Sequence, residues 1–271
     1  MIPFSTCSKE TLASIKGVLT DIDDTLTTDG KLPASTYMSM EMLQKNGILV
    51  IPITGRPAGW CDAIARIWPV DAVIGENGAF YFRYDSQNRQ MIRHFVDPIE
   101  KRLEDKVRLQ SIANEVLATV KGSGISADQA YRETDLAIDF CEDVPRLPRQ
   151  SVNKIVEIMS RFGLTVKVSS IHVNGWFGYY DKLTMSKVCA RDCFDIDLTQ
   201  QESEFLFTGD SPNDSPMFEF FSNSVGVANV RDFKGELDTP PKYVTENRGG
   251  EGFSEVAEAI LAAQDILPES S

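Results

Sequence analysis

Short, continuous apolar runs alternate with helix-like segments in the N-terminal third of the chain, and this alternation limits the possible folds more than any other feature. The apolar runs are KGVLTDID (16–23), ILVIPIT (48–54) and DAVIGENGAFYF (71–82), the last with a turn at Asn77-Gly78. Helix-like segments lie between them, at 33–47 and 56–68. Strands that are apolar on both sides and separated by helices form parallel sheets covered on both faces. We therefore expect an α/β core built on a parallel sheet.

The same alternation returns near the C-terminal end of the chain. Buried strands are expected at SEFLFTGD (203–210) and SVGVAN (224–229), and helices at NDSPMFEFFS (213–222) and GFSEVAEAILAAQDIL (252–267). The terminal PESS is expected to fray. Two separated stretches with one pattern indicate a single Rossmann-like core, residues 1–84 and 181–271, interrupted by an insertion.

The inserted segment, residues 85–180, has a different pattern. Helices are expected at 99–122 and 148–163, and strands at 134–140, 164–170 and 171–180, the last with a turn at Asn174-Gly175. Long helices combined with a half-exposed, alternating strand are typical of an α+β unit that leaves one sheet face open. We expect this segment to form an inserted α+β cap domain.

Composition narrows the class of partner. The net charge of −13, from 27 basic and 40 acidic residues, argues against nucleic-acid and membrane partners, which need a basic face. It leaves a small phosphate ester possible, because a metal ion and a few local cations can hold one. Only two histidines occur, which argues against a histidine-rich zinc site. The five scattered cysteines include no CxxC pair, and they indicate reduced thiols in a cytoplasmic protein.

The stretch DIDDT places Asp21 and Asp23 directly after the first predicted strand. Two carboxylates that leave a strand at alternate positions can enter one crevice, where a cation must offset their repulsion. Oxygen ligands suit Mg²⁺, one carboxylate can attack phosphorus, and a second can transfer protons. A calcium loop is excluded, because its glycine and glutamate positions hold Leu26 and Leu32. A solvated acidic turn remains the alternative on this stretch alone.

Two further polar clusters follow predicted strands, where ligands bind in open α/β sheets. In ITGRP, Thr54 and the backbone at Gly55 can hydrogen-bond a phosphoryl oxygen, and Arg56 can add positive charge. Taken alone, this cluster is better explained by an ordinary strand-to-helix turn.

The second of these clusters is GDSPND, in which Asp210 and Asp214 flank a turn into a helix. Asp214 or Asn213 alone would be explained as a helix cap. Placed beside Asp21 and Asp23, the cluster predicts a Mg²⁺ site at neighbouring strand ends.

Phosphate binding also requires a positive group. Lys182, in YYDKLTMSK, lies where the insertion returns to the sheet, and we predict that it reaches the site. Lys187 is expected on a helix surface.

These four signatures, in this order, resemble the haloacid dehalogenase superfamily of phosphatases. IGENGA (74–79) and VGVANV (225–230) are also similar to this family. An insertion of this size between the second and third signatures resembles the type IIB cap branch. That branch includes sucrose-phosphate, trehalose-phosphate and mannosyl-3-phosphoglycerate phosphatases, and also phosphomannomutase. One departure is Asp24, where many members of the family have glycine.

The resemblance implies a role for each matching residue. Asp21 would form an aspartyl-phosphate, and Asp23 would act as general acid and then as base. Thr54 and Lys182 would hold the phosphoryl oxygens. Mg²⁺ would be bound by the Asp21 side chain, the Asp23 backbone carbonyl and Asp210. Asp214 would bind the ion through water or orient Lys182, with Asn213 supporting the loop. Asp24 and Asp29 are expected to have no catalytic part.

The cap determines the substrate in this branch. His172, Asn174 and Trp176 precede Lys182 closely and are candidates to contact a sugar, with a place in the cap core as the alternative for Trp176. Arg132 is a weaker candidate for a second anionic group.

We therefore expect a Mg²⁺-dependent phosphatase acting on a small phosphorylated sugar or sugar acid. A phosphomutase is the alternative, followed by a non-catalytic sugar-phosphate sensor.

Overall fold

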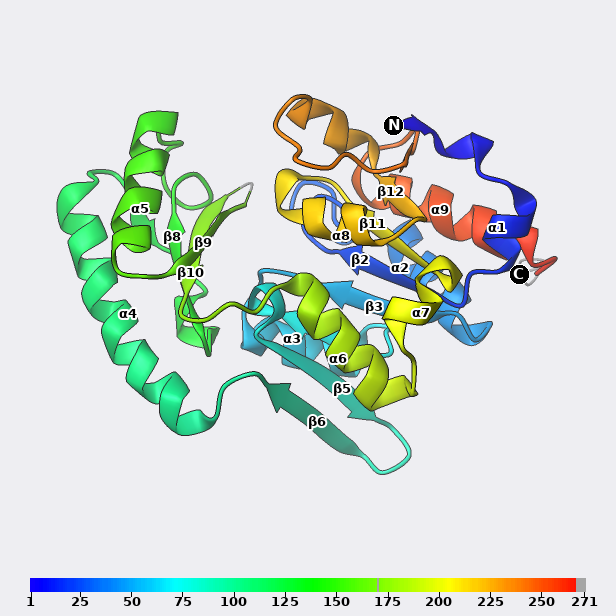
Figure 1. Ribbon diagram of the computed structural model, residues 1–271, viewed down its shortest axis with the longest axis horizontal. Helices are drawn as coiled ribbons and strands as arrows, with labels where there is room; N and C mark the ends of the chain where they lie inside the picture. The colour runs from blue at the N-terminus through cyan, green and yellow to red at the C-terminus, as the bar shows by residue number, and fades with distance from the viewer. Residues whose placement is uncertain (170, 267–271) are drawn as a thin grey trace.

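The computed structural model describes residues 1–169 and 171–266. Within these residues, nine strands form a large sheet in the order β1-β13-β12-β11-β2-β3-β4-β5-β6 (Figure 1). The pairs from β1 to β4 are parallel, and the pairs β4–β5 and β5–β6 are antiparallel. The strands are β1 (Ile2–Pro3), β2 (Gly17–Asp21), β3 (Leu49–Ile53), β4 (Val73–Gly75), β5 (Phe80–Asp85), β6 (Gln90–Phe95), β11 (Phe205–Gly209), β12 (Ser224–Gly226) and β13 (Tyr243–Val244).

Helices cover both faces of this sheet, and the sequence of the central strands explains why. Successive strand residues point to opposite faces, so Val18 packs in one apolar cluster and Leu19 in the other. The first cluster includes residues of α1, α2, α3 and α9, and the second includes residues of α6, α7 and α8. The expected α/β, Rossmann-like core is confirmed. The helices are α1 (Lys9–Ala13), α2 (Ala34–Lys45), α3 (Ala58–Ile67), α6 (Lys182–Phe194), α7 (Leu198–Gln201), α8 (Ser215–Phe220) and α9 (Gly249–Ala263).

The cap is a smaller sheet beside the core (Figure 1). Its antiparallel strands are β7 (Gly124–Ile125), β8 (Asp135–Asp139), β10 (His172–Trp176) and β9 (Thr165–Val168), in that order. Two helices, α4 (Ile99–Thr119) and α5 (Arg149–Arg161), pack with Leu136, Ile138 and Val173 in a third apolar cluster. The alternate positions of β10, His172 and Asn174, point away from that cluster and line a pocket with core residues. The cap sheet therefore presents a polar face to the core.

Two details differ from the expectation. No turn interrupts the strand at Asn174-Gly175, because β10 is continuous through both residues. A Cβ at Gly175 would lie 2.5 Å from Met159 Cε, so a larger residue there would force the Met159 side chain of α5 to shift. In addition, β6 pairs with β5 in the large sheet, and we propose that the core extends to about residue 95 before the cap begins.

Ser170 and the terminal PESS lie outside the described residues. No described helix is long and apolar enough to cross a membrane.

Candidate active site

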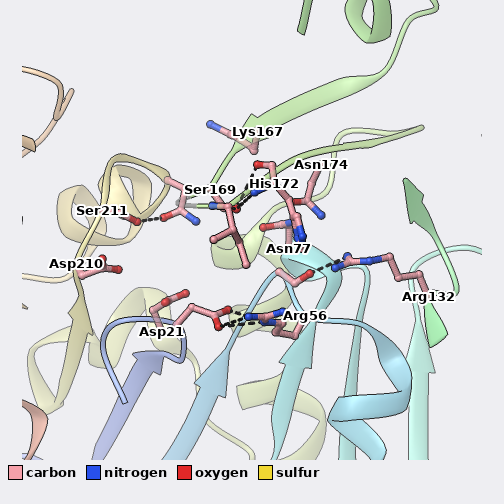
Figure 2. Close-up of a pocket in the computed structure, with 14 residues that line it drawn as sticks. Asp21, Arg56, Asn77, Arg132, Lys167, Ser169, His172, Asn174, Asp210 and Ser211 are labelled. Atoms are coloured by element: carbon pink, nitrogen blue, oxygen red, sulfur yellow. Dashed lines mark hydrogen bonds and ion pairs between the residues drawn. The ribbon is translucent and has the colours of Figure 1, made fainter. Parts of the chain in front are cut away.

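The carboxyl ends of β2, β3 and β11 lie side by side. The strand register pairs Asp21 of β2 with Ile53 of β3, and Thr208 of β11 with Thr20 of β2. The residues that follow these ends therefore share one edge of the sheet. In Figure 2, Asp21 and Asp210 extend from adjacent strand ends toward the same space.

Three buried carboxylates meet at this edge. Oxygen atoms of Asp21, Asp210 and Asp214 all lie within 4.8 Å of one another. Burial raises the pKa of Asp21 to about 8, and the neighbouring Asp214 and Asp23 carboxylates add to the increase. Burial, followed by Asp21 and Asp214, also raises the pKa of Asp210 well above its ordinary value. The cluster thus carries more negative charge than the neighbouring groups neutralise. A bound metal ion would compensate for the excess.

Lys182 supplies the positive charge inside this cluster. Its Nζ lies 2.6 Å from Asp21 Oδ1 and 2.7 Å from Asp214 Oδ1. Burial alone would lower the pKa of this ammonium, but the two carboxylates reverse the effect and hold it above its ordinary value. The start of α6 can approach the site because residue 78 is glycine: a Cβ there would lie 2.1 Å from the Asp181 carbonyl oxygen.

Asp214 organises the loop as well as the lysine. Its Oδ2 accepts hydrogen bonds from the backbone N–H groups of Asp210 (3.2 Å) and Ser211 (3.4 Å), while Oδ1 contacts Lys182. The Ser211 hydroxyl lies 2.6 Å from Asn213 Oδ1. The loop after β11 is therefore held in one conformation by the aspartate it contains.

Only part of the predicted cluster ITGRP (53–57) lines the pocket, and the rest is buried beneath it. Thr54 is fully buried, and its Oγ1 accepts the N–H of Arg56 at 3.0 Å. Gly55 and Arg56 line the pocket. Arg56 faces carboxylates: Nε donates to Asp23 at 3.0 and 3.1 Å, and Nη1 lies 3.2 Å from Glu142 of the cap.

The cap face contributes His172, Asn174, Lys167 and Ser169 to the same pocket, opposite the strand ends (Figure 2). Asn174 Nδ2 donates to Asp135 Oδ2 at 2.9 Å. Among the described residues, Lys167 forms no ion pair or hydrogen bond through its ammonium. It is thus a cation of this pocket that is available to an incoming ligand.

Two of the predicted cap residues, Arg132 and Trp176, are buried and contact other groups of the protein. Arg132 is buried and lines the pocket, and its guanidinium is surrounded by Asp128, Asp135 and the Gly55 carbonyl oxygen, so the expected contact with a second anionic group stays a prediction. Trp176 is buried and stacks on Tyr180, with ring centroids 5.6 Å apart. It belongs to an apolar cluster rather than to the pocket.

Sequence reasoning missed Asn77, Lys167, Ser169 and Ser211 as pocket residues, and Glu142 as the cap partner of Arg56. A signal existed for Lys167. Its polar position alternates with apolar neighbours in LTVKVSS, which places it on the open face of the predicted strand. Glu142 lies in an irregular turn, where no periodicity indicates its direction.

Comparisons with known proteins agree with this arrangement. Residues 18–128 match the model of the haloacid dehalogenase-like hydrolases. A phosphoglycolate phosphatase of Methanothrix thermoacetophila is 24% identical over 92% of this chain and 98% of its own length.

Solved structures give the same fold. A Thermoplasma acidophilum protein superposes with a TM-score of 0.68 at 18% identity, covering 93% of this chain and 99% of its own. The sucrose-phosphatase of Synechocystis, solved with sucrose and phosphate, has a TM-score of 0.62 at 17% identity, covering 93% and 98%. The order of the polar clusters, their meeting at one sheet edge and the family match over residues 18–128 lead to one conclusion: the chain is similar to the haloacid dehalogenase-like hydrolases in sequence pattern and in fold.

Proposed function

We propose that this hydrolase is a Mg²⁺-dependent phosphatase that cleaves a small phosphorylated sugar or sugar acid. The observation that carries the proposal is the buried cluster of Asp21, Asp210 and Asp214 with Lys182 inside it. A nucleophile, a cation site and an ammonium group within a few ångströms are what phosphoryl transfer requires.

Asp21, Asp210 and Asp214, with the Asp23 backbone carbonyl, would hold Mg²⁺. When bound, the ion would neutralise charge on the phosphoryl group and on these carboxylates. The donor set fits, because all the proposed ligands are oxygen atoms and the three side chains are buried together.

The chain's own residues would act in two steps. An Asp21 oxygen attacks phosphorus, the bond from phosphorus to the ester oxygen breaks, and Asp23 gives its proton to the departing alcohol. Asp23 then takes a proton from water, whose oxygen attacks phosphorus and breaks the bond to Asp21. The products are the alcohol and inorganic phosphate. Lys182, the Thr54 hydroxyl and the Gly55 backbone N–H would stabilise the phosphoryl oxygens.

Lys167 favours a substrate with a second anionic group. It is the pocket cation without a carboxylate partner among the described residues, whereas Arg56 and Arg132 are both paired. Phosphoglycolate, which appears in the name of the Methanothrix relative, has a carboxylate as its second anionic group. We therefore place phosphorylated hydroxy acids first among the candidate substrates. The five cysteines are scattered along the sequence and form no CxxC pair, which fits a reducing compartment, and we propose that the enzyme works in the cytoplasm.

The test is a phosphate-release screen with Mg²⁺ over phosphoglycolate, phosphoglycerates, hexose phosphates and nucleotides. We expect release from at least one small acid or sugar ester, and loss of release in Asp21→Asn. Conversion of hexose 1-phosphate to hexose 6-phosphate without release would instead identify a phosphomutase. Ligand binding without turnover would identify a sensor.

A further inference from the structure

Arg56 connects the proposed acid–base residue to the cap. Its Nε lies 3.0 and 3.1 Å from the two oxygens of Asp23, and Nη2 lies 2.9 Å from Oδ1. A guanidinium that contacts both oxygens of a carboxylate fixes its rotation as well as its distance. The orientation of Asp23 is therefore determined by the position of Arg56.

The other side of the same guanidinium is held by the cap. Nη1 and Nη2 lie 3.2 and 3.3 Å from Glu142 Oε1, and Nη1 lies 3.7 Å from Asp128. The Trp60 ring lies 4.6 Å from the guanidinium carbon. The Arg56 side chain is only 9% exposed, so these groups define its position rather than solvent.

Glu142 is itself held firmly. His172 Nε2 lies 2.9 Å from Glu142 Oε2, and this contact, together with Arg56, lowers the pKa of Glu142 to about 2. The carboxylate is therefore charged at neutral pH. The backbone of its turn is fixed as well, because the Asp139 carboxylate accepts hydrogen bonds from the N–H groups of residues 141, 142 and 143, each at 2.8 Å.

We propose that Glu142 is a positioning residue: by holding Arg56 from the cap, it orients Asp23 for proton transfer, so that the acid–base group is correctly placed only when the cap is seated on the core. The chain of contacts runs from Asp139 to Glu142, Arg56 and Asp23. The proposal rests on the proposed function, since it assigns Asp23 the proton transfers of a phosphatase. It adds that a cap residue without direct access to the reacting atoms controls those transfers.

A comparison of leaving groups tests this role. An alkyl ester such as phosphoglycolate needs a proton on its departing oxygen, whereas the nitrophenolate of p-nitrophenyl phosphate leaves without one. In Glu142→Gln we expect the first-turnover release of the alcohol from the alkyl ester to slow by about tenfold or more. The first-turnover burst of nitrophenol should keep its wild-type rate, whereas the steady-state rate should fall, because Asp23 also activates the water of the second step.

Controls separate positioning from general damage. Asp143→Asn removes a charge from the same turn, and Asp143 forms no side-chain contact within the described residues, so its kinetics should match wild type. In an Asp23→Ala background, Glu142→Gln should cause no further loss, because its effect acts through Asp23.

Three results would overturn the proposal: an equal slowing of the first turnover for both esters, no change for either, or effects of Asp23→Ala and Glu142→Gln that multiply. A wild-type enzyme that releases phosphate from no ester would instead refute the proposed function itself.

Circular dichroism and the melting temperature establish that each variant is folded before its kinetics are compared. If Glu142→Gln does not fold, Arg56→Lys, which keeps the charge but not the two-point contact, should give the same difference between the esters.

Discussion

The ammonium of Lys182 lies 2.6 Å from the Asp21 carboxylate, although 161 positions separate the two residues in the chain. The contact exists because α6 begins at Lys182 beside the end of β2, with Gly78 leaving room for the helix. Asp21 and Asp214 are both buried against this ammonium. The lysine therefore stabilises the site in the absence of any ligand, and its removal should affect folding as well as catalysis.

Replacing Lys182 by methionine should destabilise the protein and make its stability more dependent on Mg²⁺. Loss of one partner of a buried ion pair costs about 3–5 kcal/mol, because the remaining carboxylates are left without compensation. Melting temperatures measured with increasing Mg²⁺ should rise more steeply for Lys182→Met than for wild type. Equal slopes would mean that the ion does not bind beside Asp21 and Asp214.

Removal of the metal should abolish phosphate release reversibly. EDTA should stop turnover and lower the melting temperature, and added Mg²⁺ should restore both. A ligand at one hundred times its Kd stabilises the folded state by about 2.7 kcal/mol. Asp210→Asn should shift the half-saturating Mg²⁺ concentration upward, whereas Asp29→Asn, an exposed change in the same acidic region, should not. Full activity in EDTA would refute the metal dependence.

Lys167→Met should weaken the binding of acidic substrates selectively. Loss of one exposed charge contact corresponds to about 1 kcal/mol, which raises KM for phosphoglycolate by about fivefold with little change in kcat. The KM for ethyl phosphate, which lacks a carboxylate, should not change. Lys121→Met, an exposed cap lysine after α4, is the matched control. Equal increases in KM for both esters would show that Lys167 does not select for the second anionic group.

Glu142 should contribute to stability in a defined pH range. Its pKa is about 2 in the folded protein and 4.5 as an ordinary glutamate, so its contribution is fully present above about pH 4.5 and is lost as pH falls toward 2. The difference in free energy of unfolding between wild type and Glu142→Gln should therefore shrink over that range. Urea unfolding at several pH values measures it, and a difference that does not vary with pH would contradict the assigned contacts.

Glu76 should prove important for stability. Its fully buried carboxylate accepts hydrogen bonds from the N–H groups of Ala58 (2.9 Å), Glu133 (2.9 Å) and Thr134 (2.6 Å), and from the Thr134 hydroxyl (2.5 Å). Glutamine offers one oxygen in place of two, so Glu76→Gln leaves buried donors unsatisfied and should cost about 2 kcal/mol. The exposed Glu219→Gln is the control, and a melting temperature unchanged in both variants would disprove this role.

Much of the core could be predicted because its signals are local. Buried strands such as ILVIPIT are continuous in sequence, and the groups that follow them, Asp21 and Asp210, necessarily meet at one edge of a parallel sheet. The position of Lys182 was predictable for the same reason, since it lies where the insertion rejoins the sheet.

The cap side was less predictable because its contacts depend on how two sheets face each other. Arg132 has the positive charge expected of an anion-binding residue, yet its guanidinium forms ion pairs with Asp128 and Asp135 of the protein itself. The pair Asn174-Gly175 is typical of a turn, yet both residues lie inside the continuous strand β10, where the Met159 side chain packs against the glycine. Neither outcome is determined by residues adjacent in the sequence.

Asp24, the position where many relatives have glycine, has a φ of +59°. Its backbone is held on both sides, because its N–H donates to Thr27 Oγ1 at 3.0 Å and its carbonyl oxygen accepts from Asn229 at 2.6 Å. That left-handed conformation costs most side chains about 1–2 kcal/mol, and glycine, asparagine and aspartate tolerate it best. Substitution among these three residues should be nearly neutral. What the fold requires at position 24 is thus a backbone angle, which the side chain there needs only to tolerate.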